Sequence, residues 1–328
     1  MVSIKHDNEV TPIKSHWFAL AAGLALTVTG CGTTSPAPSA SSHAIVHVVY
    51  AGSLAYINDV VLGPAFTHAT GNRYEGQGGG SFAMAKELAS HLIPGDVFES
   101  VGTAPIEDLE PKQTTWSVRV SATPLVIAYN PKSPEASYFR QVAEGKVSLK
   151  AFFEYLASHR VNIGRTNPLT DPQGQAFYEM VELAVMHYHL PSDTVQKILG
   201  PWNNSKQIYS EEGLPTELQS GGLDLSSAFL PEVIQDHMDY IALPGWLNFS
   251  VASDASWYAK SSIDLPSGRV HGQVLAIWAT VLNKSGVGAQ FVRYLLKHEA
   301  VLRKYGYPPL SPVVQGNAKA VPANVPHV

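Results

Sequence analysis

Short runs of β-branched and apolar residues alternate with helix-periodic runs along most of this chain of 328 residues. Strands are predicted at 44–50, 96–101, 116–129, 161–165, 223–229 and 274–282. Helices are predicted after Ser53 and at 81–92, 149–158, 171–189, 212–219, 286–297 and 299–305. Strands that alternate with helices in this way predict an α/β fold with mainly parallel sheets.

Two of the predicted helices begin at a serine that directly follows a glycine. Ser53 follows Gly52 at the end of the first strand, as a predicted N-cap, and Ser81 follows Gly80. A helix start offers free N–H groups and a partial positive charge, glycine lets a ligand approach closely, and the hydroxyl adds a donor. Two such starts together would bind an anion without any cationic side chain. The alternative is that both serines only begin helices, because serine is a common N-cap.

The two helices are defined by apolar positions at helical spacing. These positions are Leu54, Ile57, Val60 and Val61 in the first helix, and Phe82, Ala85, Leu88, Ala89 and Leu92 in the second. The whole chain is 45% hydrophobic and 15% charged, with a net charge of −5. This composition predicts a globular protein of one large or two medium domains. It gives no indication of a nucleic-acid partner, and an anion site would have to be local.

Residues 1–31 are predicted to be a lipoprotein signal peptide. An apolar stretch from Trp17 to Val28 follows Lys5 and Lys14, and it is too short to span a bilayer comfortably. The stretch ends in Val-Thr-Gly-Cys, which resembles a lipobox, and Cys31 is the only cysteine of the chain. We therefore expect lipidation at Cys31, whereas the alternative is an ordinary signal peptide with an incidental cysteine. A single cysteine also forms no internal disulfide.

Residues 32–43 are rich in Ser, Thr, Pro and Ala, a composition that predicts a flexible tether. A lipid anchor followed by such a tether would hold the rest of the chain outside the cytoplasm, close to the membrane surface.

Several motifs follow one another in a fixed order over residues 45–312. They are AGSL after a strand, GGGS at a helix start, a DVF strand, SATPLVIAYNPKS, IGRTNPLTDPQG, SGGLDLSSAF and KYGYPPLSP. This order resembles the archaeal-type molybdate/tungstate-binding proteins of ABC importers, which are two-lobed periplasmic binding proteins. The resemblance implies two α/β lobes joined by two crossing strands, with lobe 1 at 44–122 and 243–328 and lobe 2 at 123–242.

The resemblance also implies a function and a set of ligand contacts. It implies a monomer without catalytic activity or cofactor that delivers molybdate or tungstate to a membrane permease. Ser53 and Ser81 would be the serine ligands, the segment around Ala122 would lend backbone N–H groups, and Asp171 matches a carboxylate that in some members coordinates the metal atom. The ligand residues implied are Gly52, Ser53, Gly80, Ser81, Ala122, Thr123 and Asp171.

The chain departs from the family pattern at one ligand. The second family carboxylate, a Glu, aligns with Ala228, and a neighbouring family Tyr aligns with Phe229. A lone ionised Asp171 would repel a dianion by about 1–4 kcal/mol at 4 Å, so it must coordinate the metal atom, be protonated, or only cap its helix. Sulfate or another tetrahedral oxyanion therefore stays an alternative ligand.

Other chemistries have weaker support. Ser81 lies in Gly-Gly-Ser-Phe-Ala, which half-matches the G-x-S-x-G elbow of a secreted serine hydrolase. Residues 72–77 before it are too polar for the buried central strand that such an elbow needs, and no motif marks a histidine as the base. His187 and His189 could be metal ligands, but no cysteine or acidic cluster joins them. Neither a P-loop nor a dinucleotide fingerprint is present.

Overall fold

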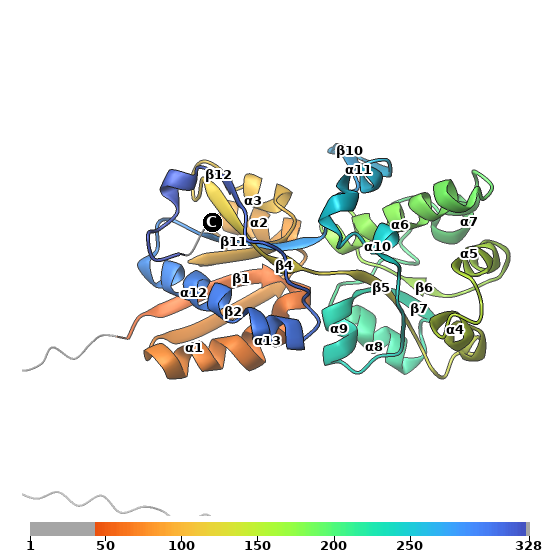
Figure 1. Cartoon of the computed structure of the whole chain (residues 1–328), viewed down its shortest axis with the longest axis horizontal. Helices are drawn as coiled ribbons and strands as arrows, with labels where there is room; N and C mark the ends of the chain where they lie inside the picture. The colour runs from red at the N-terminus through yellow and green to blue at the C-terminus, as the bar shows by residue number, and fades with distance from the viewer. Residues whose placement is uncertain (1–42, 326–328) are drawn as a thin grey trace, which may run out of the picture. The chain divides into compact units, whose positions relative to one another are not determined.

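The computed structural model describes residues 43–325, which form one compact unit in Figure 1. The predicted signal peptide, Cys31 and nearly all of the predicted tether lie outside the described residues. Within 43–325, no helix combines the length and the apolar character that crossing a membrane requires.

Two separate sheets define two lobes. The sheet of lobe 1 has the order β12-β4-β11-β3-β1-β2. Its strands are Ile45–Ala51 (β1), Arg73–Gly79 (β2), Val97–Val101 (β3), Trp116–Ala122 (β4), Ala276–Val281 (β11) and Val314–Gly316 (β12). β1 runs parallel to β2 and β3, whereas β11 runs antiparallel to β3 and β4.

The sheet of lobe 2 has the order β6-β7-β5-β8. Its strands are Leu125–Tyr129 (β5), Ile163–Gly164 (β6), Leu225–Phe229 (β7) and Tyr240–Ile241 (β8). Every residue of β5 and β7 is buried, which fits their apolar or small side chains. β5 is antiparallel to both neighbours and β7 is parallel to β6, so this sheet is mixed as well.

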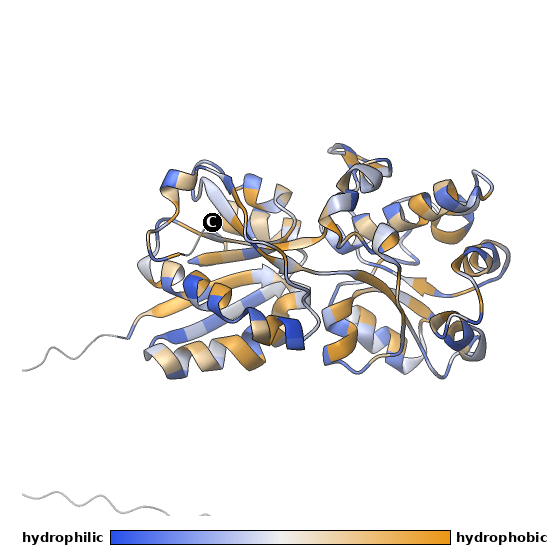
Figure 2. Cartoon of the chain, viewed as in Figure 1, coloured by the Kyte–Doolittle hydropathy of each residue, from blue (hydrophilic) through white to orange (hydrophobic). Residues whose placement is uncertain are grey.

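Helices pack around each sheet. Those of lobe 1 are Gly63–Thr70 (α1), Ser81–Ala89 (α2), Ala104–Glu107 (α3), Gly286–Lys297 (α12) and Glu299–Lys304 (α13). Those of lobe 2 are Ala136–Ala143 (α4), Leu149–Ser158 (α5), Pro172–Tyr188 (α6), Thr194–Leu199 (α7), Gly213–Ser220 (α8) and Leu230–Gln235 (α9). Figure 2 shows mixed polar and apolar colouring along these helices, as expected for elements with one face on a core.

The chain passes between the sheets near Pro124, where β4 ends and β5 begins, and it returns to lobe 1 through β11 (Figure 1). Before β11 it forms Gly245–Asn248 (α10), Ala255–Tyr258 (α11) and a hairpin of Ser262–Leu265 (β9) and Gly268–His271 (β10). The sequence prediction put this segment in lobe 1, but it packs against α6 of lobe 2. The Ser262 N–H donates to Glu182 at 2.7 Å, and the Trp246 ring stacks on His187 at 4.0 Å.

The prediction of a two-lobed α/β fold is confirmed, but the sheets are mixed rather than mainly parallel. β2 escaped prediction because its sequence is polar. It lies at the edge of its sheet, where it pairs only with β1 and stays largely exposed. The second predicted helix ends at Ala89 rather than 92, and Leu92 is 75% exposed. Val60, expected on a buried face, is 58% exposed.

Arg165, which follows β6, is a fully buried cation without a carboxylate partner in the part of the chain that the structure describes. Its guanidinium donates to the carbonyl oxygens of Thr166, Pro201 and Trp202 at 3.4, 3.2 and 2.9 Å. The planar fork thus joins β6 to the loop after α7, and burial lowers the pKa of Arg165 to about 10.

We expect Arg165→Lys to lower the free energy of unfolding by about 2–3 kcal/mol, because an ammonium cannot reach all three carbonyls and leaves buried acceptors unpaired. Urea denaturation measures this loss. The same substitution at the exposed Arg160 should change stability by less than about 0.5 kcal/mol. An equal loss in both variants would contradict this role of Arg165.

Candidate functional site in the interlobe cleft

The Ser53 helix start is irregular. The chain leaves β1 through a 3₁₀ turn, Gly52–Leu54, and continues as a π-helical segment, Tyr56–Leu62, before α1. Ser53 lies inside the first turn, and the N-cap is Ala51, so the prediction of Ser53 as an N-cap is wrong. Its hydroxyl is therefore not used in capping. Ser53 is only 4% exposed, and its Oγ has no hydrogen-bond partner among the described residues.

The Ser81 helix start is regular. α2 begins at Ser81 with Gly80 as its N-cap. The Ser81 Oγ accepts a hydrogen bond from the Val101 N–H at 3.2 Å, which leaves the hydroxyl proton free to donate.

The two helix starts are neighbours because of strand register. β1 and β2 are parallel, and Ala51 lies opposite Gly79. Gly52 and Gly80 each come one residue later, at the carboxyl ends of adjacent strands. In open α/β sheets this edge is where ligands bind.

Lobe 2 contacts both glycines directly. The Phe82 N–H donates to Thr170 O at 3.1 Å, and a Cβ on Gly80 would lie 2.7 Å from that same oxygen. A Cβ on Gly52 would overlap the Glu211 carboxylate oxygen Oε2. At Gly80 the contact is with a backbone oxygen, so only glycine fits there, whereas at Gly52 the contact is with the end of a flexible side chain. The close approach expected of both glycines is thus made here by lobe 2.

The facing wall of lobe 2 is a hydrogen-bonded network centred on Gln173. Asp171 caps α6 as predicted, since its Oδ1 accepts the Gln173 N–H at 2.8 Å. The Gln173 amide accepts from the Ser227 hydroxyl at 2.6 Å and donates to Glu232 at 2.9 Å and to Glu211 at 3.4 Å. Glu232 also accepts the backbone N–H of Phe229. Three carboxyl groups therefore accept hydrogen bonds from Gln173, one from its backbone N–H and two from its side-chain amide.

These carboxyl groups have no cation to compensate them. None of the ion pairs found in residues 43–325 includes Asp171, Glu211 or Glu232. Burial raises the pKa of Asp171 to about 7 and that of Glu232 to about 8. Burial, and then the charges of Asp171 and Glu232, raise the pKa of Glu211 well above its usual range. A protonated carboxyl can donate a hydrogen bond to an anion, whereas an ionised one repels it.

The connection between the lobes, residues 121–123, offers side-chain hydroxyls rather than backbone N–H groups to the cleft. The Ala122 N–H donates to Pro308 O at 2.8 Å, and the Thr123 N–H donates to Leu275 O at 3.1 Å. Both N–H groups are thus paired with carbonyl oxygens in this structure, and the expectation that this segment lends them to a ligand stays a prediction. The hydroxyls of Ser121 and Thr123 are buried and have no partner within the described part of the chain.

A cavity of about 230 Å³ opens at the cleft beside Ser53. Its lining combines Gly52, Ser53, Ala55 and Tyr56 with Glu211, Glu212, Pro215, Glu232, Gln235 and Asp236. Across residues 43–325, no three His, Cys, Asp or Glu side chains are grouped as a metal-ion site.

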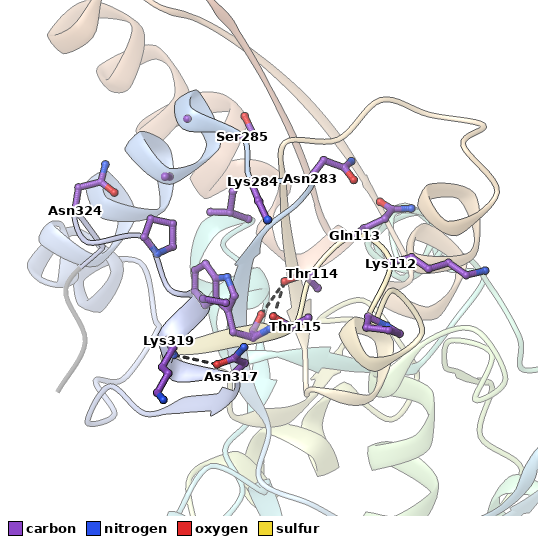
Figure 3. A pocket seen from close by; sticks show the side chains of 17 residues that line it. Lys112, Gln113, Thr114, Thr115, Asn283, Lys284, Ser285, Asn317, Lys319 and Asn324 are labelled. Atoms are coloured by element: carbon purple, nitrogen blue, oxygen red, sulfur yellow. Dashed lines mark hydrogen bonds between the residues drawn. The ribbon is translucent and has the colours of Figure 1, made fainter.

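A larger cavity of about 830 Å³ lies entirely in lobe 1, away from the cleft (Figure 3). Three lysines, Lys112, Lys284 and Lys319, lie around it. The polar groups at its floor are already paired: the Thr114 hydroxyl bonds to Thr280 at 2.6 Å, and Asn317 accepts the Lys319 N–H. None of its lining residues has a buried polar atom without a partner, so the interlobe cleft is the candidate site.

The hydrolase alternative for Ser81 lacks its partners. The strand before Ser81 is an exposed edge strand rather than a buried central one, and no histidine is hydrogen-bonded to Ser81 in the described range. His187 stacks on Trp246, and His189 ends α6 with a φ of 55°; neither belongs to a group of metal-ligating side chains within residues 43–325.

The protein has two α/β lobes, each built on a mixed sheet, and a polar cleft lies between them. This is the architecture of the two-lobed solute-binding proteins of ABC transport. Residues 46–308 match the family model of bacterial extracellular solute-binding proteins, and the chain belongs to that family. Members of this family are non-enzymatic components of transport.

The relatives connect this chain distantly with oxyanion carriers. It is 26% identical over 297 residues to an uncharacterized solute-binding protein of Saccharolobus solfataricus, covering 84% of this chain and 73% of that protein. It is 26% identical over 212 residues to the molybdate/tungstate-binding protein of Pyrococcus abyssi, covering 58% and 60%. The fold matches the periplasmic molybdate-binding protein of Azotobacter vinelandii with a TM-score of 0.54 at 17% identity, covering 81% and 99%.

We expect stability to fall as pH rises from about 5 to 8. The folded protein releases the protons of Asp171 and Glu232 only near pH 7 and 8, and that of Glu211 well above its usual range, whereas the unfolded chain releases all three at about pH 4. Each such proton contributes a slope of at most about 1.4 kcal/mol per pH unit. Urea unfolding of Glu232→Gln should show a slope smaller by about one proton's share, and Glu154→Gln on the surface should match the parent. Equal slopes in all three proteins would contradict the assignment.

Proposed function

We propose that this protein binds a tetrahedral oxyanion, with molybdate or tungstate first, and delivers it to the permease of an ABC importer. The observation that carries the proposal is the pair of adjacent glycine-serine helix starts, one with a buried and unpaired serine hydroxyl. The distant similarity to a molybdate/tungstate-binding protein supports the same ligand class.

In this proposal the oxyanion sits on the helix starts of lobe 1. Ser53 and Ser81 donate their hydroxyl protons, and Thr123 at the interlobe connection adds a third hydroxyl. Gly52 and Gly80 carry no side chain that would keep the ligand away from the backbone. Asp171 faces Gly80 from lobe 2, with its Cβ 3.4 Å from the position a Gly80 Cβ would take, and its protonated form would donate to the same ligand.

The absence of the family Glu favours sulfate as the second candidate. Ala228 is buried in a cluster that includes Leu214 and Val233, and it offers no ligand atom. A site that lacks this carboxylate holds the oxyanion by hydrogen bonds, and such bonds do not depend on a metal atom at the centre. Calorimetric titration with molybdate, tungstate, sulfate and phosphate ranks the candidates.

We expect Ser53→Ala and Ser81→Ala each to weaken oxyanion binding about ten- to a hundredfold. A hydrogen bond to a charged ligand is worth about 1.5–3 kcal/mol, and about 1.4 kcal/mol corresponds to a factor of ten. Calorimetry measures the change, and Ser90→Ala on the exposed end of α2 is the matched control. Unchanged affinity for every oxyanion in both variants would rule out this site.

We also propose that Cys31 anchors the protein to the membrane through a lipid. The expected result is that Cys31→Ser moves the protein from the membrane fraction to the soluble fraction of cells, because the lipid is the only anchor in this proposal. Immunoblots of fractionated cells measure the distribution. A Cys31→Ser protein that stays with the membrane would refute the anchor and leave the ligand site untouched.

A further inference from the structure

Glu211 lies against the helix start at which the proposed ligand would bind, and it lines the cavity beside Ser53. It lies just before α8 in lobe 2, is 5% exposed, and brings Oε2 against Gly52 of lobe 1. The backbone N–H of Ser53 favours the ionised form of this carboxyl group and so offsets part of the rise in its pKa. A carboxylate held at a helix start interacts with the same N–H groups that would bind a free anion.

The hydrogen bonding between Glu211 and the Ser53 helix start is nevertheless incomplete. Glu211 Oε2 and Ser53 Oγ are both buried, and neither has a hydrogen-bond partner in the residues that the structure describes. A buried polar atom without a partner is costly to keep, so a ligand that meets both atoms gains from filling the gap. An oxyanion between these two side chains accepts a hydrogen bond from the Ser53 hydroxyl. It also needs a hydrogen-bond donor on the side of Glu211, where an ionised carboxylate offers only an acceptor.

The groups that face Glu211 are acidic or neutral on every element packed against it. They are Asp171 and Gln173 at the start of α6, Glu232 on α9, Asp236 just after α9, the neighbouring Glu212, and Tyr307 and the Ser53 N–H from lobe 1. No Lys, Arg or His lines this cavity in the described structure. Protonation is therefore the way in which Glu211 can lose its charge.

We propose that Glu211 makes oxyanion binding depend on a proton. Ionised Glu211 occupies the Gly52–Ser53 helix start and repels the ligand. Protonated Glu211 turns its O–H toward the oxyanion and donates a hydrogen bond. At a pH where Glu211 is ionised in the free protein, binding then takes up one proton from solvent for each dianion bound, with no other bond made or broken. This inference rests on the proposed oxyanion function and names the protonation state in which the site binds.

Calorimetry of the protein with molybdate from pH 6.0 to 8.5 tests the proposal. For the parent, we expect the dissociation constant to rise with pH, by up to about tenfold per pH unit once Glu211 is ionised. Glu211→Gln keeps a donor without the charge, so its dissociation constant should change far less and should be the lower of the two at pH 8.5. Glu154→Gln, at an exposed position on α5 outside the cleft, should keep the parent's dependence.

A second measurement does not depend on any variant. Titrating the parent in two buffers of different ionisation enthalpy, at the pH where its dissociation constant rises most steeply, gives the number of protons taken up, which we expect to approach one. Binding without proton uptake, or an equal pH dependence in the parent and in Glu211→Gln, would overturn the role of Glu211 while leaving the oxyanion function standing. Failure to bind any of the four oxyanions at any pH would instead refute both.

Discussion

The cleft depends on how three buried carboxyl groups are kept together without a cation. Gln173 offers two amide protons, which it donates to Glu211 and Glu232, while its backbone N–H holds Asp171. Neither amide proton can neutralise a charge. The network is therefore stable only if protons remain on some of the carboxyl groups, and burial supplies the necessary rise in their pKa.

This constraint gives the two walls of the cleft different properties. Lobe 1 presents helix starts and serine hydroxyls, which favour negative charge. Lobe 2 presents carboxyl groups, which favour a negatively charged ligand only when they are protonated. Pairing the walls in a closed cleft thus makes lobe 2 the side that senses pH, while lobe 1 offers the same donors at every pH near neutrality.

Local patterns in the sequence predicted the local parts of this arrangement. The helix at Leu149–Ser158 and the N-cap at Asp171 follow from residues close in sequence, and the structure has both. β2 was missed because an edge strand need not be apolar. The site residues of lobe 2 were mostly missed, since Glu211, Gln173 and Glu232 meet only after α6, α8 and α9 have packed. No periodicity or motif marks such a meeting in advance.

The direct bond from the Phe82 N–H to the Thr170 carbonyl oxygen joins the two lobes through main-chain atoms alone. A substitution of either side chain leaves both of these atoms in place, so this contact does not depend on which side chains line the cleft. Mutual repulsion of the neighbouring carboxyl groups at higher pH acts against it, so the acidity of the cleft also bears on how firmly the lobes are joined.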